Sequence, residues 1–162
     1  MSPTHPNAEL IRRFYAAFGQ RDAEAMAACY ADDVQFGDPA FPDLKGAAAG
    51  DMWRMLCESA RDLRIEASEV EADDTQARAR WVAHYTFSAT GRPVVNDIRA
   101  SFRLRDGRIV EHRDVFDFAR WARQALGLPG LLLGWTGWLQ RQVQAKAARG
   151  LAGFQKKRAA GA

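Results

Sequence analysis

Two acidic residues and one histidine are the side chains of this sequence best placed for acid–base chemistry. His112 and Asp114 lie in the stretch GRIVEHRDVFDFARW, residues 107–121. With the two-residue period of a β-strand they share the more apolar face, and Ile109 falls on the other face. The apolar face consists of Val110, His112, Asp114, Phe116 and Phe118. A carboxylate there must be hydrogen-bonded, paired or neutral, because burying a lone charge is very costly. The pattern indicates a functional site or a structural ion pair, with about even weight on each.

A second acid ends another apolar alternation. Val34, Phe36 and Asp38 share one face of a short predicted strand, and Pro39, which lacks a backbone N–H, ends the pairing of that strand. Two carboxylates in one apolar pocket push their pKa values apart, which leaves one acid and one base near neutral pH. We therefore expect Asp114 to act as a general base, with Asp38 as a second acid–base group at the pocket rim. His112 would be the partner of Asp114, titrating together with it, or an acid.

Three helices are predicted to surround the strand that carries Asp38. Asn7 is a plausible N-cap of the first helix, which presents a stripe of apolar side chains. Asp22 caps a second short helix over residues 23–30. Gly46 opens a third helix, with Trp53 at its flank. The apolar stripes of all three helices face a common core.

Long strands follow these helices. Residues 63–72, 78–88 and 94–105 alternate apolar and polar side chains, and the slipped phase of the first predicts a bulge. The Asp106-Gly107 pair is a strong hairpin signal, so the Gly107 strand completes a four-stranded antiparallel meander. Helices on one face of such a sheet give an α+β domain. We predict a curved, cone-shaped antiparallel sheet wrapped by three N-terminal helices, with a ligand pocket at its open end.

The C-terminal part has a different pattern. Residues 118–126 look helical, the segment Gly127-Leu128-Pro129-Gly130 breaks that helix, and residues 131–154 can be helical again. The second of these helices begins with Leu131, Leu132, Leu133, Trp135, Trp138 and Leu139. These residues are too apolar to leave in water. We expect the cone, a second copy of the chain or another partner to cover them.

Length and composition fit one domain with an added tail. The chain has 162 residues, 48% of them hydrophobic and 27% charged, with a net charge of +3. Cys29 and Cys57 lack the spacing of metal ligands and fit buried thiols in a reducing compartment. The first residues lack the basic and apolar regions of a signal peptide, and no apolar run reaches membrane-span length. We expect a cytoplasmic protein without metal or cofactor, without nucleic-acid or membrane contact, whose basic tail is a solvated helix end.

Two segments resemble a known superfamily. YADDVQFGDP at 30–39 and GRIVEHRDVFD at 107–117 are similar to the nuclear transport factor 2-like proteins, in particular ketosteroid isomerases, SnoaL-like polyketide cyclases and limonene epoxide hydrolases. The similarity covers roughly residues 8–128. It implies that Asp38 occupies the place of the isomerase's proton-shuttling acid. Asp114 would occupy the place of the hydrolase's first catalytic acid and of the cyclase's base. The resemblance also implies a homodimer, formed through the convex polar face of the sheet.

The sequence departs from each relative at a residue that matters. Phe14 stands where the isomerase has a tyrosine, and Ala100 where it has an acid and the cyclase a histidine. Trp81 and Ala83 stand where the hydrolase has an arginine and an acid. A dienolate would therefore lack its usual hydrogen-bond donors. None of the three mechanisms transfers intact.

What remains is a pocket with two acids, a histidine and aromatic walls. The expected wall residues are Phe14, Phe18, Phe36, Trp81, Tyr85, Phe87, Phe102 and Phe116. We expect a SnoaL-like cone domain over residues 1–126 and a C-terminal helical extension over residues 127–162. The predicted function is an isomerase, cyclase or epoxide hydrolase that acts on an apolar small molecule through an aspartate base. The alternative is a non-catalytic small-molecule-binding or dimeric interaction module on the same fold.

Overall fold

The computed structural model describes residues 1–162, with three helices and two strands preceding β3 (Arg64–Ala72). The helices of this part are α1 (Pro6–Gly19), α2 (Ala23–Ala28) and α3 (Ala47–Ser59). The strands are β1 (Tyr30–Gly37), β2 (Leu44–Lys45), β3 (Arg64–Ala72), β4 (Gln76–Phe87), β5 (Arg92–Arg105) and β6 (Arg108–Val115). The C-terminal helices are α4 (Phe118–Leu126), α5 (Leu128–Leu133) and α6 (Gly137–Ala160).

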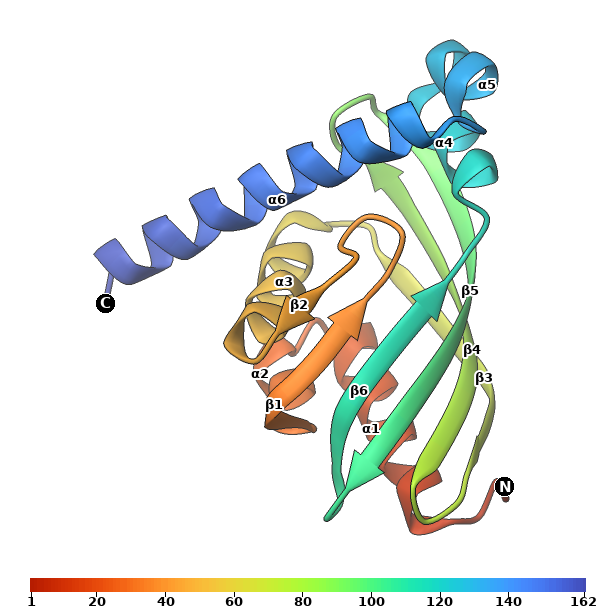
Figure 1. Cartoon of the computed structure of the whole chain (residues 1–162), viewed down its shortest axis with the longest axis vertical. Helices are drawn as coiled ribbons and strands as arrows, with labels where there is room; N and C mark the ends of the chain where they lie inside the picture. Colours follow the sequence, from red (N-terminus) through yellow and green to blue (C-terminus); the bar gives the residue numbers. More distant parts are fainter.

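The strands form one open six-stranded sheet with the order β2-β1-β6-β5-β4-β3. The sheet is strongly twisted, and α1, α2 and α3 lie on its concave side (Figure 1). This confirms the predicted α+β class and the N-terminal helices. The sheet is mixed, however, because β1 runs parallel to β6 and pairs Phe36 with His112. That pairing brings the strand that leads to Asp38 directly beside the strand that carries His112 and Asp114.

Two bulges set the phase of the strands. The predicted bulge in β3 is present: pairing with β4 shifts between Ser68 and Glu71, and Glu69 has a φ of 52°. β6 contains a second irregularity, which was not predicted. At this point Ile109 pairs with Leu104 and is fully buried. The interior position expected for Val110 is therefore wrong, and its side chain is half-buried. Beyond this shift the alternation resumes, so His112 and Asp114 still face inward.

The N-terminal helices also differ in detail from the prediction. His5 caps α1, because its Nδ1 accepts the backbone N–H of Asn7, and Asn7 is therefore not the N-cap. Asp22 caps α2 as predicted, but that helix ends at Ala28. Trp53 does not lie at an exposed flank, since only 2% of it is accessible. The reason is that α3 packs against α2, β1, β2 and α6, which cover it on more than one side.

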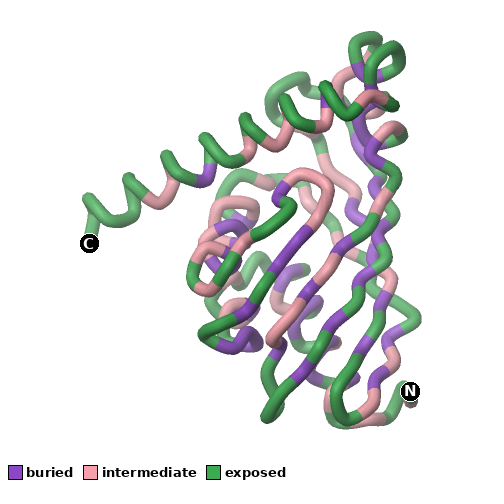
Figure 2. The backbone as a smooth tube through the Cα atoms, viewed as in Figure 1, coloured by how far each residue is buried: buried purple, intermediate pink, exposed green.

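Buried residues are concentrated in the sheet and the N-terminal helices, whereas most residues of α6 are exposed or half-buried (Figure 2). The main core fills the space between the concave sheet face and α1, α2 and α3. A smaller cluster joins β5, α4 and the start of α6 through Val94, Phe118, Trp121 and Leu139. From there α6 crosses over α3, and Leu151 reaches the main core (Figure 1). No helix has both the length and the apolar character needed to cross a membrane.

The break predicted after the first C-terminal helix is a single residue. Gly127, with a φ of 69°, separates α4 from α5, and Pro129 and Gly130 lie within α5. Of the apolar residues that follow, Leu139 is buried, but the cone does not cover the others, contrary to one of the expectations above. Trp135 and Trp138, for example, are 79% and 53% exposed.

Candidate active site

A continuous chain of hydrogen bonds crosses the core from α3 to β4. Trp53 Nε1 donates to the Tyr30 hydroxyl over 2.8 Å, and that hydroxyl lies 2.8 Å from His112 Nδ1. His112 Nε2 is 2.9 Å from Asp114 Oδ1, to which Trp81 Nε1 also donates over 3.3 Å. All five side chains are buried, and His112 has no accessible surface. The expected contact between His112 and Asp114 is therefore present, within a longer chain.

The sheet determines where these groups lie. His112 and Asp114 are two residues apart on β6, so both side chains stand on the concave face. On β5, Phe102 is the register partner of His112 and Ala100 is that of Asp114. The small side chain of Ala100 leaves Trp81, from the next strand β4, free to reach the carboxylate. The alanine that replaces the functional residue of the relatives thus makes room for an indole donor.

The hydrogen-bonding capacities of the side chains fix the positions of the protons. An indole N–H can only donate, so the Tyr30 oxygen accepts from Trp53 and its own O–H donates to His112 Nδ1. The remaining imidazole proton is then on Nε2 and is donated to Asp114 Oδ1. This arrangement, a neutral imidazole beside a carboxylate, satisfies every donor in the chain. Asp114 Oδ1 receives two N–H groups, whereas Oδ2 accepts no hydrogen bond.

Aromatic rings enclose the imidazole. The ring centroids of Phe102, Phe36 and Phe14 lie 4.3, 5.0 and 5.5 Å from that of His112. The Trp53 ring stacks on it at 6.1 Å. These contacts hold the imidazole in one orientation and exclude water from it.

The eight aromatic residues expected to line a pocket fall into two groups. Five are packed into the main core, namely Phe14, Phe18, Phe36, Trp81 and Phe102. Three are half-buried near the wide end of the cone, namely Tyr85, Phe87 and Phe116. Tyr85 and Phe116 touch both hydrophobic clusters, so they form the boundary between the filled interior and the layer made by α4 and α6.

Asp38 follows β1 and is half-buried at the same end. Its Oδ1 accepts the backbone N–H groups of Ala40 and Phe41, at 2.7 and 2.6 Å. The pKa of Asp38 is raised from 3.8 to about 6. Burial is the main cause, and the charge of Asp114 also raises the pKa, whereas the two backbone hydrogen bonds lower it. Asp38 therefore interacts electrostatically with Asp114 but makes no hydrogen bond to His112.

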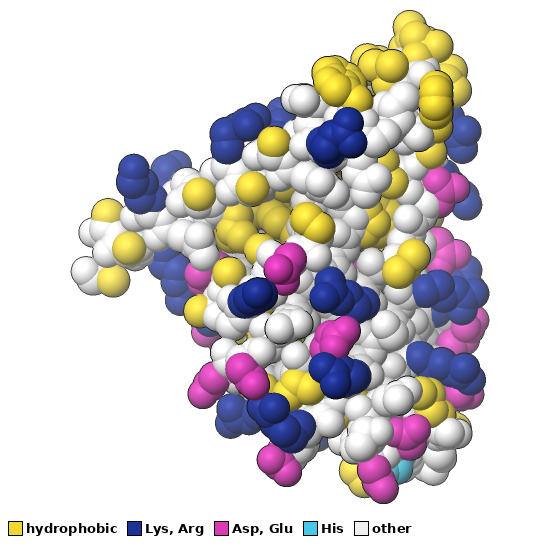
Figure 3. All heavy atoms as spheres, viewed as in Figure 1, with side chains coloured by type: hydrophobic (Ala, Val, Ile, Leu, Met, Phe, Trp, Pro, Cys, Tyr) yellow, Lys and Arg dark blue, Asp and Glu magenta, His cyan; other side chains and the backbone are white.

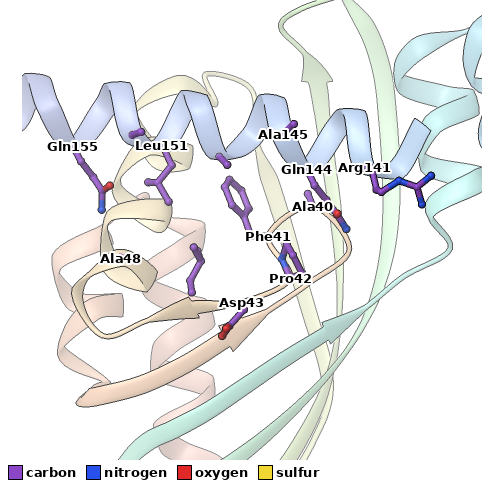
Figure 4. A pocket seen from close by; sticks show the side chains of 13 residues that line it. Ala40, Phe41, Pro42, Asp43, Ala48, Arg141, Gln144, Ala145, Leu151 and Gln155 are labelled. Atoms are coloured by element: carbon purple, nitrogen blue, oxygen red, sulfur yellow. The ribbon is translucent and has the colours of Figure 1, made fainter. Parts of the chain in front are cut away.

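The two C-terminal helices close this end of the cone. Trp121 of α4 donates to the Tyr85 hydroxyl over 2.8 Å. From α6, Gln140 and Gln144 donate to the carbonyl oxygen of Pro39, next to Asp38, over 3.3 and 3.1 Å. A groove of about 560 Å³ lies between α6 and the loop after β1, with Phe41 at its base and Leu151 above (Figure 4). None of the three pockets described in this molecule reaches Asp38, His112 or Asp114.

Tyr15 is a further polar group that the sequence analysis missed. Its side chain is 3% exposed, and its hydroxyl is the only buried side-chain oxygen or nitrogen without a hydrogen-bond partner. Burial raises the pKa of Tyr15, and the nearby charge of Asp114 raises it further. Tyr15 also lines a groove of about 550 Å³ between α1 and β3. Its free hydroxyl near Asp114 makes it a candidate ligand contact.

The fold and the site can now be compared with known proteins. A family model described as the SnoaL-like domain matches residues 11–112. The chain belongs to the SnoaL-like family. The match spans α1 to His112, and it ends two residues before Asp114. No curated protein matches this SnoaL-like chain.

Solved structures show that the SnoaL-like chain has the fold of nuclear transport factor 2-like proteins. A protein assigned as a polyketide cyclase, from Xanthomonas campestris, is 25% identical, with 74% of this chain and 96% of that chain covered and a TM-score of 0.62. An LEH-like epoxide hydrolase from M. tuberculosis is 20% identical, with coverages of 79% and 96% and a TM-score of 0.62. A protein with a ketosteroid isomerase-like fold, from Catenulispora acidiphila, is 15% identical, with coverages of 84% and 99% and a TM-score of 0.66. The last two show the fold alone.

The SnoaL-like site also contains residues that sequence reasoning left without a role. Tyr30 was visible as the first residue of the YADD segment, and its period-two relation to Val34 and Phe36 could have placed it on the inner face. Trp53 gave no such signal, since its helix carries apolar residues on several sides. For metal binding, no three His, Cys, Asp or Glu side chains lie close enough together to hold an ion.

Proposed function

We propose that this SnoaL-like protein is an enzyme that uses Asp114 as a general base on an apolar small molecule. One observation carries the proposal: His112 and Trp81 hold Asp114 Oδ1, while Oδ2 has no partner. Two N–H donors hold Oδ1 and fix the orientation of the carboxylate. A base that is held at one oxygen and free at the other is positioned to accept a proton.

The chemistry compatible with this arrangement is proton abstraction next to a carbonyl, ring closure, or addition of water. In each case Asp114 Oδ2 accepts a proton from carbon or from a water molecule. Asp38, with a pKa of about 6, can return a proton near neutral pH. The Tyr15 hydroxyl supplies a donor for the negative charge that develops on a substrate oxygen. Tyr15 would thus supply from α1 the hydrogen-bond donor that Phe14, which has no hydroxyl, cannot provide.

The names of the structural neighbours support the same range of reactions. They include a protein assigned as a polyketide cyclase and an epoxide hydrolase. The aromatic residues around the site favour an apolar substrate over a charged one, because Phe36, Phe102 and Phe116 offer no polar group. Access to Asp114 would come from the wide end, where Tyr85 and Phe116 are half-buried.

A second candidate is a non-catalytic binding module. The packed interior favours it, because the pockets described above do not reach Asp114. In this case the polar chain from Trp53 to Asp114 anchors a ligand by hydrogen bonds, and no bond in the ligand changes.

The test is a turnover assay on a panel of three substrate types: a β,γ-unsaturated cyclic ketone, an aliphatic epoxide and a polyketide-like ester. Asp114→Asn keeps an oxygen for His112 and Trp81 but removes the base. We expect turnover of the active panel member to fall by about 10²–10⁴-fold, with ligand affinity retained. The matched control is Asp33→Asn, which alters an exposed carboxylate paired with Arg105 and should leave turnover unchanged. Ligand binding without turnover, or full turnover by Asp114→Asn, would establish the binding module instead.

A further inference from the structure

A group of large apolar side chains stands uncovered where α5 leads into α6. We call this group the apolar tip; it consists of Leu128, Leu131, Leu132, Trp135 and Trp138, which are 65, 54, 60, 79 and 53% exposed. Hydrophobic side chains gather at this end of the molecule, over α5 (Figure 3). Only three comparably large exposed apolar residues lie outside the segment from Leu128 to Trp138, namely Met1, Val95 and Val115. The tip is therefore a concentrated feature, unlike the scattered apolar residues of an ordinary surface.

The backbone holds the tip in place. Gly130 lies so close to α4 that a Cβ added there would be 1.9 Å from the carbonyl oxygen of Ala122. Gly134 also lies near α4, less tightly, since its added Cβ would be 3.1 Å from the side chain of Ala122. This contact presses one face of α5 against α4, and the leucine side chains are directed away from the body.

The charge of the C-terminal segment that contains the tip is strongly one-sided. Residues 118–162 contain no Asp or Glu and eight cationic residues: Arg120, Arg123, Arg141, Lys146, Arg149, Lys156, Lys157 and Arg158. The remaining 15 Lys and Arg face 20 Asp and Glu in residues 1–117, so the body is acidic. Of these eight cationic side chains, only Arg158 makes a salt bridge. The tail thus combines an apolar tip with unneutralised positive charge.

We propose that the apolar tip and the cationic residues of α4 and α6 dock the protein onto the surface of an anionic lipid bilayer. Leucine and tryptophan side chains insert at the boundary between headgroups and acyl chains, where the amphipathic indole is favoured. Lysine and arginine near that boundary are attracted to acidic headgroups. The sequence alone predicted no membrane contact; the uncovered tip in the folded chain is the observation that changes this expectation.

Charge also argues against a second copy of the chain as the occupant. A two-fold symmetric contact places the same surface of both copies face to face. Contact through the tip would therefore bring Arg120, Arg123 and Arg141 close to their own counterparts. An anionic bilayer neutralises these charges, whereas a second copy would oppose them. This proposal does not depend on the proposed enzymatic function.

The test is sedimentation of the full-length protein with vesicles. One set of vesicles is phosphatidylcholine alone, and the other is equal parts phosphatidylcholine and phosphatidylglycerol. We expect binding to the anionic vesicles only, weakened by added salt, because screening reduces the attraction of exposed charges. The fluorescence of Trp135 and Trp138 should shift to shorter wavelength on binding.

Variants separate the apolar and the charged contributions. Leu131→Ser with Trp135→Ser should lower partitioning by about tenfold or more. Lys156→Gln with Lys157→Gln should lower it less and reduce its salt dependence. The matched control is Val115→Ser, which removes a 65% exposed apolar side chain outside the tip and should leave binding unchanged.

Three results would overturn the proposal. The first is an absence of wild-type binding to the anionic vesicles. The second is unchanged binding by the double tip variant. The third is a dimer in light scattering that the double tip variant dissociates, since this would identify a second copy as the occupant.

Discussion

Tyr15 and Tyr30 allow the hydrogen-bond chain to be tested with one chemical change made at two places. Both are buried, 3% and 5% exposed, but only the Tyr30 hydroxyl has hydrogen-bond partners. Tyr30→Phe leaves the Trp53 N–H and His112 Nδ1 without partners. Each unsatisfied buried group costs about 1–3 kcal/mol, so the free energy of unfolding should fall by roughly 2–6 kcal/mol. Tyr15→Phe removes a hydroxyl that has no protein partner, and should raise the free energy of unfolding by up to about 1 kcal/mol.

Urea denaturation followed by circular dichroism and tryptophan fluorescence measures both changes, with the free energy obtained by linear extrapolation. Each substitution keeps the aromatic ring, so the two variants control each other for ring packing. The reasoning requires Tyr15→Phe to be more stable than Tyr30→Phe by roughly 2 kcal/mol or more. Equal stabilities, or the reverse order, would refute the hydrogen bonds assigned to the Tyr30 hydroxyl.

Two further predictions concern Asp38 and the C-terminal helices. Because the folded-state pKa of Asp38 is about 6, above its usual 3.8, its contribution to stability is greatest below about pH 4 and is lost as the pH rises through 6. Asp38→Asn should therefore gain stability relative to wild type between pH 4 and 7 in thermal melts, and a constant difference across this range would contradict the assignment. Gly130→Ala should detach α5 from α4, because the added Cβ meets the backbone of Ala122, and faster hydrogen exchange in α5 would report this. Its control, Gly153→Ala, faces open space in α6 and should stabilise that helix by about 1 kcal/mol.

The sequence predicted those parts of the fold whose signal is local. The alternation in β4 and β5, the Asp106-Gly107 turn and the cap at Asp22 are each set by neighbouring residues, and all are present. The bulge near Val110 was missed because Ile109 and Val110 are both β-branched and apolar. Either can be buried, and only pairing with Leu104 of β5 decides which one faces inward.

For the candidate site, the sequence indicated the acids and the histidine but not their surroundings. The contact between His112 and Asp114 follows from their spacing on one strand. The contacts with Tyr30, Trp53 and Trp81 join elements far apart in the chain, and the parallel pairing of β1 with β6 has no local signal. The prediction of an open pocket assumed that the aromatic side chains line an empty cavity. Five of them instead pack against one another or against His112, because the concave side of the sheet is narrow where α1 and α3 meet it.

The free oxygen of Asp114 is the feature that supports the proposed catalytic role of this carboxylate. The Tyr15 hydroxyl is the only fully buried polar side-chain atom without a partner, so Asp114 Oδ2, which accepts no hydrogen bond from the protein, keeps some accessible surface. In Asp114 both available donors converge on Oδ1, and Oδ2 receives none. The Tyr15 hydroxyl, within electrostatic range of Asp114, is likewise unpaired. A free acceptor and a free donor in one region are complementary to a ligand that carries both a proton to lose and an oxygen to be stabilised. We favour catalysis over passive binding because the free oxygen belongs to a carboxylate whose other oxygen is held by two N–H donors, which is the arrangement a general base needs.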